Sequence, residues 1–466
     1  MYLLGLISCL FLGTALAIWP LPTHYTSGTE VLWIDRDVQI IYAGANQVQT
    51  SLLKQSRVLQ WLRGSNPQTA GYGSLYNSTG SNTIISTAIS SAKDTLFNKN
   101  FVPWKFHPRD AGYEPTWNAS RTHIRSVVLQ QNGTDANDVL KPLAGDVDES
   151  YSLSLTTDGK VTIIAPSSIG LAHGLTTFTQ LFYKHTDGDI YTALAPVQIF
   201  DSPKFQHRGL NMDVSRSYYA PSDILRMIDA LSYSKMNRLH IHVTDAQSWP
   251  LEIPALPLLA EKGAYGPGLS YSPAVVQYIQ KYGAARGVEV FFEIDMPGHT
   301  SSIAYSHPEL VAAFNQQPDW SSYAAEPPSG TLKLNSSAVS DFLNTLLGDL
   351  LPRLYPYSSY FHTGGDEVNP NAYVLDDTVK SNDTAVIQPL MQKFVDRNHD
   401  QVRAAGMTPI VWEEMLLQWN VTLGSDVVVQ TWQSDDAVLQ TVQQGHKALV
   451  GNYQYWVSTH TPSHLI

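Results

Sequence analysis

The sequence contains a single cysteine and few charged residues. Of its 466 residues only Cys9 is a cysteine, and Asp, Glu, Lys and Arg together make up 15% of the chain, against roughly 25% in a typical soluble domain. A chain with one cysteine forms no internal disulfide, so packing must hold its cores together. We expect Ser, Thr, Asn and Gln, or attached glycans, to supply most of the polar surface.

Positive charge is also scarce. Lys and Arg number 29 against 41 for Asp and Glu, which gives a formal net charge of −12. Binding to nucleic acid requires a basic surface, so we expect no nucleic acid among the partners. Hydrophobic residues (43%) and aromatic residues (11%) are abundant. This composition excludes global disorder, and the length suits two or three domains.

Long apolar runs are absent after the N-terminus. Residues 1–17 form an apolar run with small residues at Ala15 and Ala17, which predicts a secretory signal peptide cleaved after Ala17. The alternative is a membrane anchor, but the run is shorter than the ~20 residues that span a bilayer. We therefore expect a secreted protein, extracellular or in the cell wall, with no membrane span in its mature form. Six N-x-[ST] sequons predict glycosylation: Asn77, Asn118, Asn132, Asn335, Asn382 and Asn420.

Residues 18–200 have the pattern of a small α+β domain. Short alternating strands, such as His123–Gln130, are mixed with helical stretches at Thr83–Phe97 and Ile169–Tyr183, and we expect a mixed sheet. Residues 64–83 are rich in Gly, Ser, Asn and Gln, which is typical of a loop or processed linker. No catalytic cluster is evident in this domain.

From residue 201 onward, short β-branched runs alternate with helical stretches. Such repeats imply parallel strands joined by crossover helices. Seven units in about 250 residues predict a (β/α)₈ TIM barrel, within 201–456, although an eighth strand is not evident. The predicted strands are Leu210–Val214, Arg238–Val243, Val288–Ile294, Tyr360–Thr363, Pro409–Trp412, Val427–Thr431 and Ala448–Asn452.

Polar side chains gather where these strands end, and a barrel of this kind has its active site at the carboxyl ends of its strands. In chain order these residues are Asp213 and Arg216, then His240, His242, Asp245, Gln247 and Trp249, then Glu293, Asp295 and His299, then His362, Asp366 and Glu367, then Trp412, Glu413 and Glu414, and finally Trp432.

The most specific of these segments is HTGGDEV at 362–368. Its two glycines allow a tight turn, and the adjacent carboxylates Asp366 and Glu367 repel each other, so that one pKa should rise. A raised pKa suits a general acid, whereas the alternative is a helix start with acidic residues in its first turn. Carboxylates beside tryptophans suggest a sugar ligand.

The pair His240 and His242 permits a metal-dependent hydrolase as an alternative. Two residues apart on a strand, both side chains point to the same side, and His299 and Asp295 could complete a set of ligands. Each histidine is also explained as a hydrogen-bonding support for a carboxylate, so our main hypothesis includes neither a metal nor a cofactor.

At these residues the chain resembles the β-N-acetylhexosaminidases of glycoside hydrolase family 20, particularly the secreted fungal ones. The matching segments are WPLP (19–22), HRGLNMDVSRSYY (207–219), KMNRLHIHVTDAQSWPLEIP (235–254), FFEIDMPGHTSS (291–302), HTGGDEV (362–368), IVWEE (410–414) and VVVQTW (427–432). The resemblance implies a zincin-like α/β domain before a catalytic barrel. It also implies removal of terminal GlcNAc or GalNAc from chitin oligosaccharides or glycans, with retention, and with the substrate's acetamido group as nucleophile.

The resemblance also assigns roles to individual residues. Glu367 would be the general acid/base, and Asp366 would orient the acetamido group and stabilise an oxazolinium intermediate. Residues that would bind the sugar are Arg208, Trp412 and Trp432, and the pair Asp245 and His299 would support the acid. His240 and His362 are further supporting residues of the predicted site. The sugar preference and a homodimeric state are left open.

The resemblance ends near residue 456. Residues 457–466 match no segment of the family, so we expect a barrel that lacks its last βα unit, with unpaired edges. A chain ending there is expected to fold poorly and to be nearly inactive, which leaves a truncated inactive or sugar-binding-only product as a further alternative.

Overall fold

The computed structural model describes residues 18–44, 47–49, 80–116 and 121–451. The chain divides into two compact units, the first comprising Met1–Gln55, Ile85–Thr134 and Asp148–Pro203, and the second the remainder. Residues Asp135–Val147 therefore belong to the second unit, although they lie within the predicted N-terminal domain. The predicted signal peptide, most of the 64–83 segment, the 457–466 tail and two sequons (Asn77 and Asn118) lie outside the described residues.

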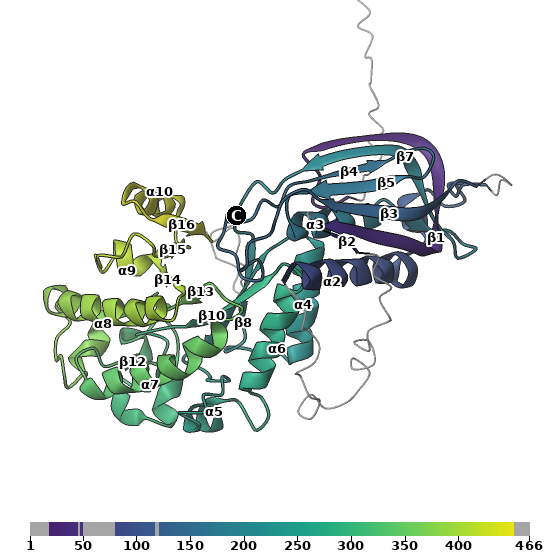
Figure 1. Ribbon diagram of the computed structural model, residues 1–466. Coiled ribbons are helices and arrows are strands. Elements are labelled where there is room, and N and C mark those ends of the chain that lie inside the picture. Colours follow the sequence, from purple (N-terminus) through teal and green to yellow (C-terminus); the bar gives the residue numbers. More distant parts are fainter. Residues whose placement is uncertain (1–17, 45–46, 50–79, 117–120, 452–466) are drawn as a thin grey trace, which may run out of the picture. The chain divides into compact units, whose positions relative to one another are not determined.

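The first unit is built on a mixed sheet, as predicted (Figure 1). The strands occur in the order β2-β1-β3-β5-β4-β7-β6, and β1 also pairs with β7. Their bounds are β1 His24–Gly44, β2 Gln47–Gln49, β3 His123–Gln131, β4 Tyr151–Leu155, β5 Val161–Ala165, β6 Tyr183–Lys184 and β7 Ile190–Asp201. The strands β2, β6 and β7 were not predicted. The helices are α2 Gly80–Asp94 and α3 Ser168–Thr179, with a π-helical turn at Thr95–Lys99 and a 3₁₀ turn at Trp104–Phe106.

Helix α3 packs tightly on this sheet. Ser167 caps its first turn by accepting a hydrogen bond from the backbone N–H of Gly170. A side chain on Gly174 would place its Cβ 2.5 Å from a methyl group of Ile163, so only glycine permits this approach. The buried side chains of Leu171, Leu175 and Phe178 complete the core beneath the strands.

The second unit is a seven-stranded sheet whose neighbouring strands are parallel and lie in chain order from β8 to β16. All seven strands lie within two residues of their predicted positions. Their bounds are β8 Gly209–Asp213, β9 Arg238–Thr244, β10 Glu289–Ile294, β13 Tyr360–His362, β14 Thr408–Trp412, β15 Val428–Thr431 and β16 Lys447–Val450. Within the described residues no pairing joins β8 to β16.

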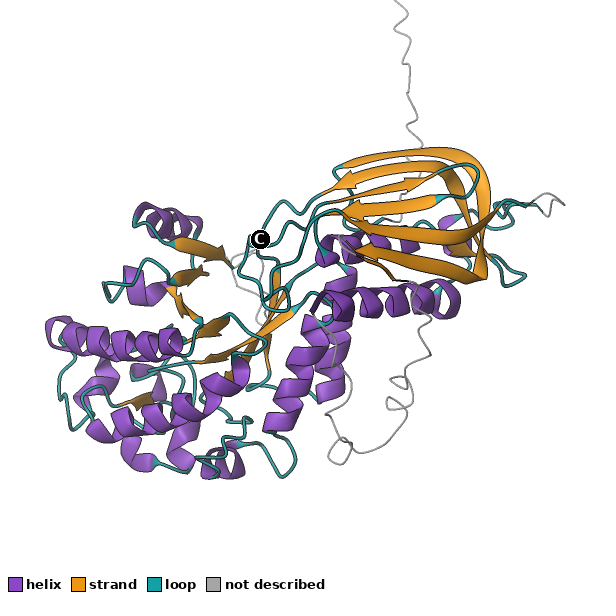
Figure 2. Ribbon diagram, viewed as in Figure 1, coloured by secondary structure: helices purple, strands orange, loops and turns teal. Residues whose placement is uncertain are grey.

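Helices flank this sheet and form βα units with the strands (Figure 2). The long helices are α4 Pro221–Tyr233, α6 Pro273–Ala284, α7 Ser337–Leu354, α8 Thr384–Ala404 and α10 Asp435–Gln443. Shorter elements are α5 Leu258–Gly263, α9 Glu413–Leu417, the pair β11 Val311–Ala312 and β12 Thr331–Leu332, and 3₁₀ turns at Ser301–Tyr305, Pro308–Leu310, Trp320–Ser322 and Pro370–Val374.

Helix α4 shows how the sequence pattern builds this layer. Pro221 stands at its first turn, where the missing N–H costs nothing. Ile224, Ile228 and Leu231 recur at helical spacing and are buried in the core of the unit. Burial of each such side chain is worth about 1.5–3 kcal/mol. Among the described residues, no helix combines the length and the hydropathy needed to cross a bilayer.

Candidate active site

The turn after β13 presents the two adjacent carboxylates. Gly364 and Gly365 have φ values of 71° and 108°, and Glu367 has a φ of 50°. A Cβ on Gly364 would lie 1.9 Å from Oδ1 of Asp295, and the N–H of Gly365 donates to the same oxygen over 2.8 Å. The glycines therefore allow the backbone to lie against Asp295 while Asp366 and Glu367 follow directly. The left-handed conformation of Glu367 is a strained geometry typical of functional sites.

His299 links these carboxylates to Asp245. Its Nδ1 lies 3.1 Å from Oδ1 of Asp245, and its Nε2 lies 3.4 Å from Oε2 of Glu367 and 3.9 Å from Oδ2 of Asp366. Burial opposes a charge on His299, but Asp245, Asp295 and Asp366 raise its pKa well above the ordinary value. Although burial acts in the opposite direction, His299 and His242 lower the pKa of Asp245. The predicted supporting pair Asp245–His299 thus lies beside Glu367.

Asp295 lies next to Asp366 and is fully buried. Burial and the neighbouring carboxylate of Asp366 raise the pKa of Asp295 well above the ordinary value. Burial also raises the pKa of Asp366, with added repulsion from Glu293 and Glu367. The sequence predicted that carboxylate repulsion would raise one pKa in the Asp366–Glu367 pair. The structure adds Asp295, whose own pKa is raised by burial and by the neighbouring charge of Asp366.

Two tryptophans follow the next two strands. Trp412 ends β14, and its Nε1 donates to Oε1 of Glu293 over 2.7 Å. Trp432 follows β15, and its Nε1 donates to Oε1 of Glu414 over 2.9 Å. Burial raises the pKa of Glu414 to about 8, and the charge of Asp366 contributes to this shift. Trp412 is buried, whereas Trp432 is half-buried.

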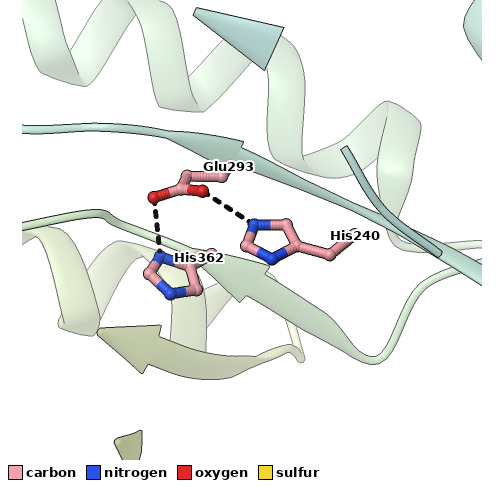
Figure 3. A group of neighbouring side chains, drawn as sticks. All are labelled: His240, Glu293 and His362. Atoms are coloured by element: carbon pink, nitrogen blue, oxygen red, sulfur yellow. Dashed lines mark ion pairs between the residues drawn. The ribbon is translucent and has the colours of Figure 1, made fainter. Parts of the chain in front are cut away.

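The predicted supporting residues His240 and His362 contact Glu293, a carboxylate on the neighbouring strand β10, rather than Asp366 or Glu367 (Figure 3). His240 Nε2 lies 2.7 Å from Oε2 of Glu293, and His362 Nδ1 lies 3.3 Å from Oε1. The N–H of Gly364 donates to Nδ1 of His362, so that ring carries its proton on Nε2 when neutral. Burial lowers the pKa of His362 to about 3, which keeps it neutral.

Comparisons with known proteins identify this arrangement. The model of the glycosyl hydrolase family 20 catalytic domain matches residues 205–461, and a model described as beta-acetyl hexosaminidase like matches residues 18–181. A beta-hexosaminidase of Arthroderma benhamiae is 40% identical over 460 residues, which cover 95% of this chain and 76% of that protein. The chain belongs to glycosyl hydrolase family 20. By family it is a glycoside hydrolase of the β-hexosaminidase type.

Further relatives agree with this assignment. Beta-hexosaminidase 1 of Arabidopsis thaliana is 28% identical over 454 residues, which cover 95% of this chain and 73% of that protein. The chitobiase of Flavobacterium johnsoniae superposes with a TM-score of 0.69 at 23% identity. That match covers 94% of this chain but only 59% of the chitobiase. It shows that the family 20 chain has a TIM-barrel-like fold with an N-terminal domain.

The structure does not bring the predicted sugar-binding Arg208 to the site of this family 20 chain. Arg208 precedes β8, at the amino end of the strand, and its guanidinium donates to the carbonyl oxygens of Lys235 and Phe205. Arg216 instead follows the carboxyl end of β8, and its Nη2 lies 3.1 Å from Oδ2 of Asp245. The prediction chose the arginine at the wrong end of the strand.

Three other residues of the site had no role in the main hypothesis, namely Glu326, Glu293 and Asp295. Arg216 also contacts Asp213 (2.6 Å) and Glu326, which lies in the loop before β12. Glu326 gave no signal in the sequence, because nothing relates that loop to a strand end. Glu293 and Asp295 belonged to the strand-end series, which could have indicated them.

Proposed function

We propose that this chain is a retaining exo-β-N-acetylhexosaminidase that removes terminal GlcNAc or GalNAc from chitin oligosaccharides or glycans by substrate-assisted catalysis. The observation that carries the proposal is the placement of Asp366 and Glu367 side by side next to His299. Two carboxylates that follow each other in the chain reach neighbouring atoms of one substrate rather than opposite faces of a sugar ring. This placement suits a reaction in which the nucleophile belongs to the substrate.

In the first step, Glu367 donates a proton to the glycosidic oxygen while the acetamido oxygen attacks C1. The bond between C1 and the leaving oxygen breaks, and the acetamido group becomes a cyclic oxazolinium. Asp366 accepts the N–H of the acetamido group and stabilises the positive charge that develops on it. Glu367 is exposed and Asp366 is half-buried, as expected for groups that reach the substrate.

In the second step, a water molecule attacks C1 and transfers its proton to Glu367. The bond between C1 and the acetamido oxygen breaks, which restores the acetamido group and leaves the new hydroxyl on the original face. Two inversions at C1 yield retention. His299, held by Asp245, keeps Glu367 in position for both proton transfers.

Arg216 and the tryptophans suit recognition of the sugar. The guanidinium of Arg216 is partly exposed and anchored by Asp213, Asp245 and Glu326, so its fork of donors can bind hydroxyl groups. Trp412 and Trp432 offer apolar faces against which the acetamido methyl group can pack.

The test is hydrolysis of 4-nitrophenyl N-acetyl-β-glucosaminide and of chitobiose by the purified chain. We expect release of N-acetylglucosamine, with β as the first-formed anomer by NMR, and at a rate far below that of relatives if the predicted loss of the last βα unit is correct. The matched control is 4-nitrophenyl β-glucoside, which lacks the acetamido group and should not be cleaved. Cleavage of both glycosides at similar rates, or an α product, would contradict the mechanism. Binding without turnover would favour the sugar-binding-only alternative.

A metal-dependent hydrolase is the second candidate. Ligand atoms of His240, Glu293 and His362 all lie within 4.8 Å of one another, a spacing that could hold a cation. Against this reading, the carboxylate of Glu293 already lies near a ring nitrogen of His242 and the indole N–H of Trp412. Dialysis against EDTA separates the two candidates, because only metal-dependent turnover should be lost and then restored by added metal.

Export of the protein belongs to the same proposal. The four described sequon asparagines, Asn132, Asn335, Asn382 and Asn420, are all exposed, as glycosylation requires. Mass spectrometry of protein recovered from the culture medium should find glycans on these residues and an N-terminus at Ile18. Retention of the intact chain in the cell would contradict export.

A further inference from the structure

Glu293 is a fully buried carboxylate at the centre of the second unit. It lies on β10, and its partners come from the neighbouring strands β9, β13 and β14. One oxygen, Oε2, lies 2.7 Å from His240 Nε2 and 2.8 Å from His242 Nδ1. The other oxygen, Oε1, accepts the indole N–H of Trp412 over 2.7 Å. One side chain therefore contacts two different parts of the candidate site.

We propose that Glu293 is a positioning residue that couples the acid–base half of the active site, which contains Glu367, to its aromatic half, which contains Trp412. The inference rests on the proposed function, because both halves are defined by it. The acid–base half is reached through His242, Asp245 and His299. The aromatic half is reached through Trp412.

The acid–base connection is a continuous series of ion pairs. His242 places Nδ1 2.8 Å from Glu293 and Nε2 2.7 Å from Oδ2 of Asp245. Both ring nitrogens thus face carboxylates, so both carry protons and the ring is a cation. Burial disfavours that charge, but Glu293 and Asp245 raise the pKa of His242 well above its ordinary value.

Beyond His242 the series runs outward to the catalytic group. The second oxygen of Asp245 lies 3.1 Å from His299, which in turn lies 3.4 Å from Glu367. Negative and positive groups alternate along this path from Glu293 as far as His299. Loss of the Glu293 charge would leave His242 with one carboxylate instead of two. Asp245 would then reorient, and His299 would no longer hold Glu367 in its present position.

The aromatic connection includes the hydrogen bond from the indole of Trp412 to Glu293. Trp412 is buried, and Glu293 is the acceptor of its indole N–H. A buried donor without an acceptor costs about 1–3 kcal/mol, so the indole would turn away if Glu293 could no longer accept its hydrogen bond. Such a rotation would alter the wall of the proposed acetamido pocket.

Glu289 provides a matched control on the same strand. It is also fully buried, and its Oε2 lies 3.3 Å from Nε of Arg238. Its Oε1 accepts hydrogen bonds from Ser358 and from the backbone N–H of Ser359. Glu289 stands at the amino end of β10, four residues before Glu293, and the partners named here are not site residues. Glu289→Gln therefore tests the cost of neutralising a buried glutamate at a position remote from catalysis.

The experiment compares kcat/KM for two N-acetyl-β-glucosaminides, one with phenol and one with 2,4-dinitrophenol as leaving group. Only the poorer leaving group, phenol, needs strong proton donation, so loss of acid positioning lowers its rate selectively. We expect His242→Gln to lower kcat/KM roughly 10-fold to 100-fold for the phenyl glycoside, and far less for the dinitrophenyl glycoside. Trp412→Phe should lower both values equally.

Glu293→Gln removes the charge but keeps an oxygen that can accept the indole N–H of Trp412, so it should lower kcat/KM mainly for the phenyl glycoside. Glu293→Leu removes both the charge and the acceptor, so it should add an equal loss for the two substrates. Glu289→Gln should leave the ratio of the two rates unchanged, whatever it does to the amount of folded enzyme. An unchanged ratio in folded Glu293→Gln, or the same altered ratio in Glu289→Gln, overturns the inference.

If Glu293→Gln does not fold, the ratio of the two rates in His242→Gln tests the inference instead. That variant keeps Glu293 and its contacts with His240 and Trp412. A wild-type ratio in that variant overturns the inference. Absence of turnover by the unmodified chain on both substrates would refute the proposed function itself, and the inference with it. The two failures are therefore distinguishable.

Discussion

Glu414 allows a quantitative prediction of how stability depends on pH. Its carboxyl group is buried, and its hydrogen-bond donors in the described residues, Trp432 and Gln433, are uncharged. It lies on α9 and is 1% exposed. Its Oε1 accepts hydrogen bonds from Nε1 of Trp432 (2.9 Å) and Nε2 of Gln433 (2.8 Å). Burial, reinforced by the charge of Asp366, raises its pKa from the ordinary 4.5 to about 8.

This shift makes stability depend on pH with a defined sign. A carboxyl group whose pKa is raised on folding binds its proton more tightly in the folded state. It therefore costs no stability below pH 4.5, and the cost grows as pH rises until it is complete above about pH 8. At about 1.4 kcal/mol per pH unit, the cost is under about 1 kcal/mol at pH 5 and about 3 kcal/mol at pH 7.

Glu414→Gln removes this cost, because an amide retains the accepting oxygen but does not titrate. We expect the variant to have nearly the wild-type free energy of unfolding at pH 5, and to exceed the wild type by about 3 kcal/mol at pH 7. Urea unfolding followed by tryptophan fluorescence at pH 5, 6, 7 and 8 measures this difference. Glu261→Gln, on the exposed surface of α5, is the control and should show a constant difference. A constant difference for Glu414→Gln would refute the reasoning.

Three further outcomes test the site. Glu367→Gln should lower kcat roughly 10²–10⁴-fold with little change in folding, and wild-type kcat would exclude Glu367 as the general acid. Arg216→Lys should raise KM about tenfold or more, since a lysine cannot provide the fork of donors. Arg208→Lys is the control and should leave KM unchanged. The reverse result would show that Arg208, and not Arg216, binds the sugar. Gly364→Ala should lose at least about 2 kcal/mol of stability together with activity, because its Cβ would displace Asp295 and φ is positive; a normal thermal midpoint would show that the turn can adjust.

Much of the second unit could be predicted from local patterns. β-branched runs bounded by helical stretches identified all seven parallel strands. The strands β2, β6 and β7 were missed in the first unit. In β7, Ala195 and Pro196 interrupt the β-branched pattern, and pairing with β1 and β4 supplies the order instead.

The arginines show where sequence reasoning chose wrongly. Arg208 and Arg216 flank the same strand, and only the second lies at the carboxyl end where the polar clusters gather. The rule that places barrel active sites at that end already favoured Arg216. The matching segment HRGLNMDVSRSYY contains both arginines, so resemblance over the segment does not by itself decide between them.

The sequence by itself determined the family, the order of the βα units, and the adjacent carboxylates Asp366 and Glu367, since each depends on residues close together in the chain. Only the tertiary structure decided which distant titratable and polar groups are neighbours. Asp295 lies beside Asp366, and Glu293 joins His242 to Trp412, across strands separated by up to 170 positions. Strand periodicity specifies the face on which a side chain lies, but the register between strands determines its partner. Burial then decides whether that partner holds a charge.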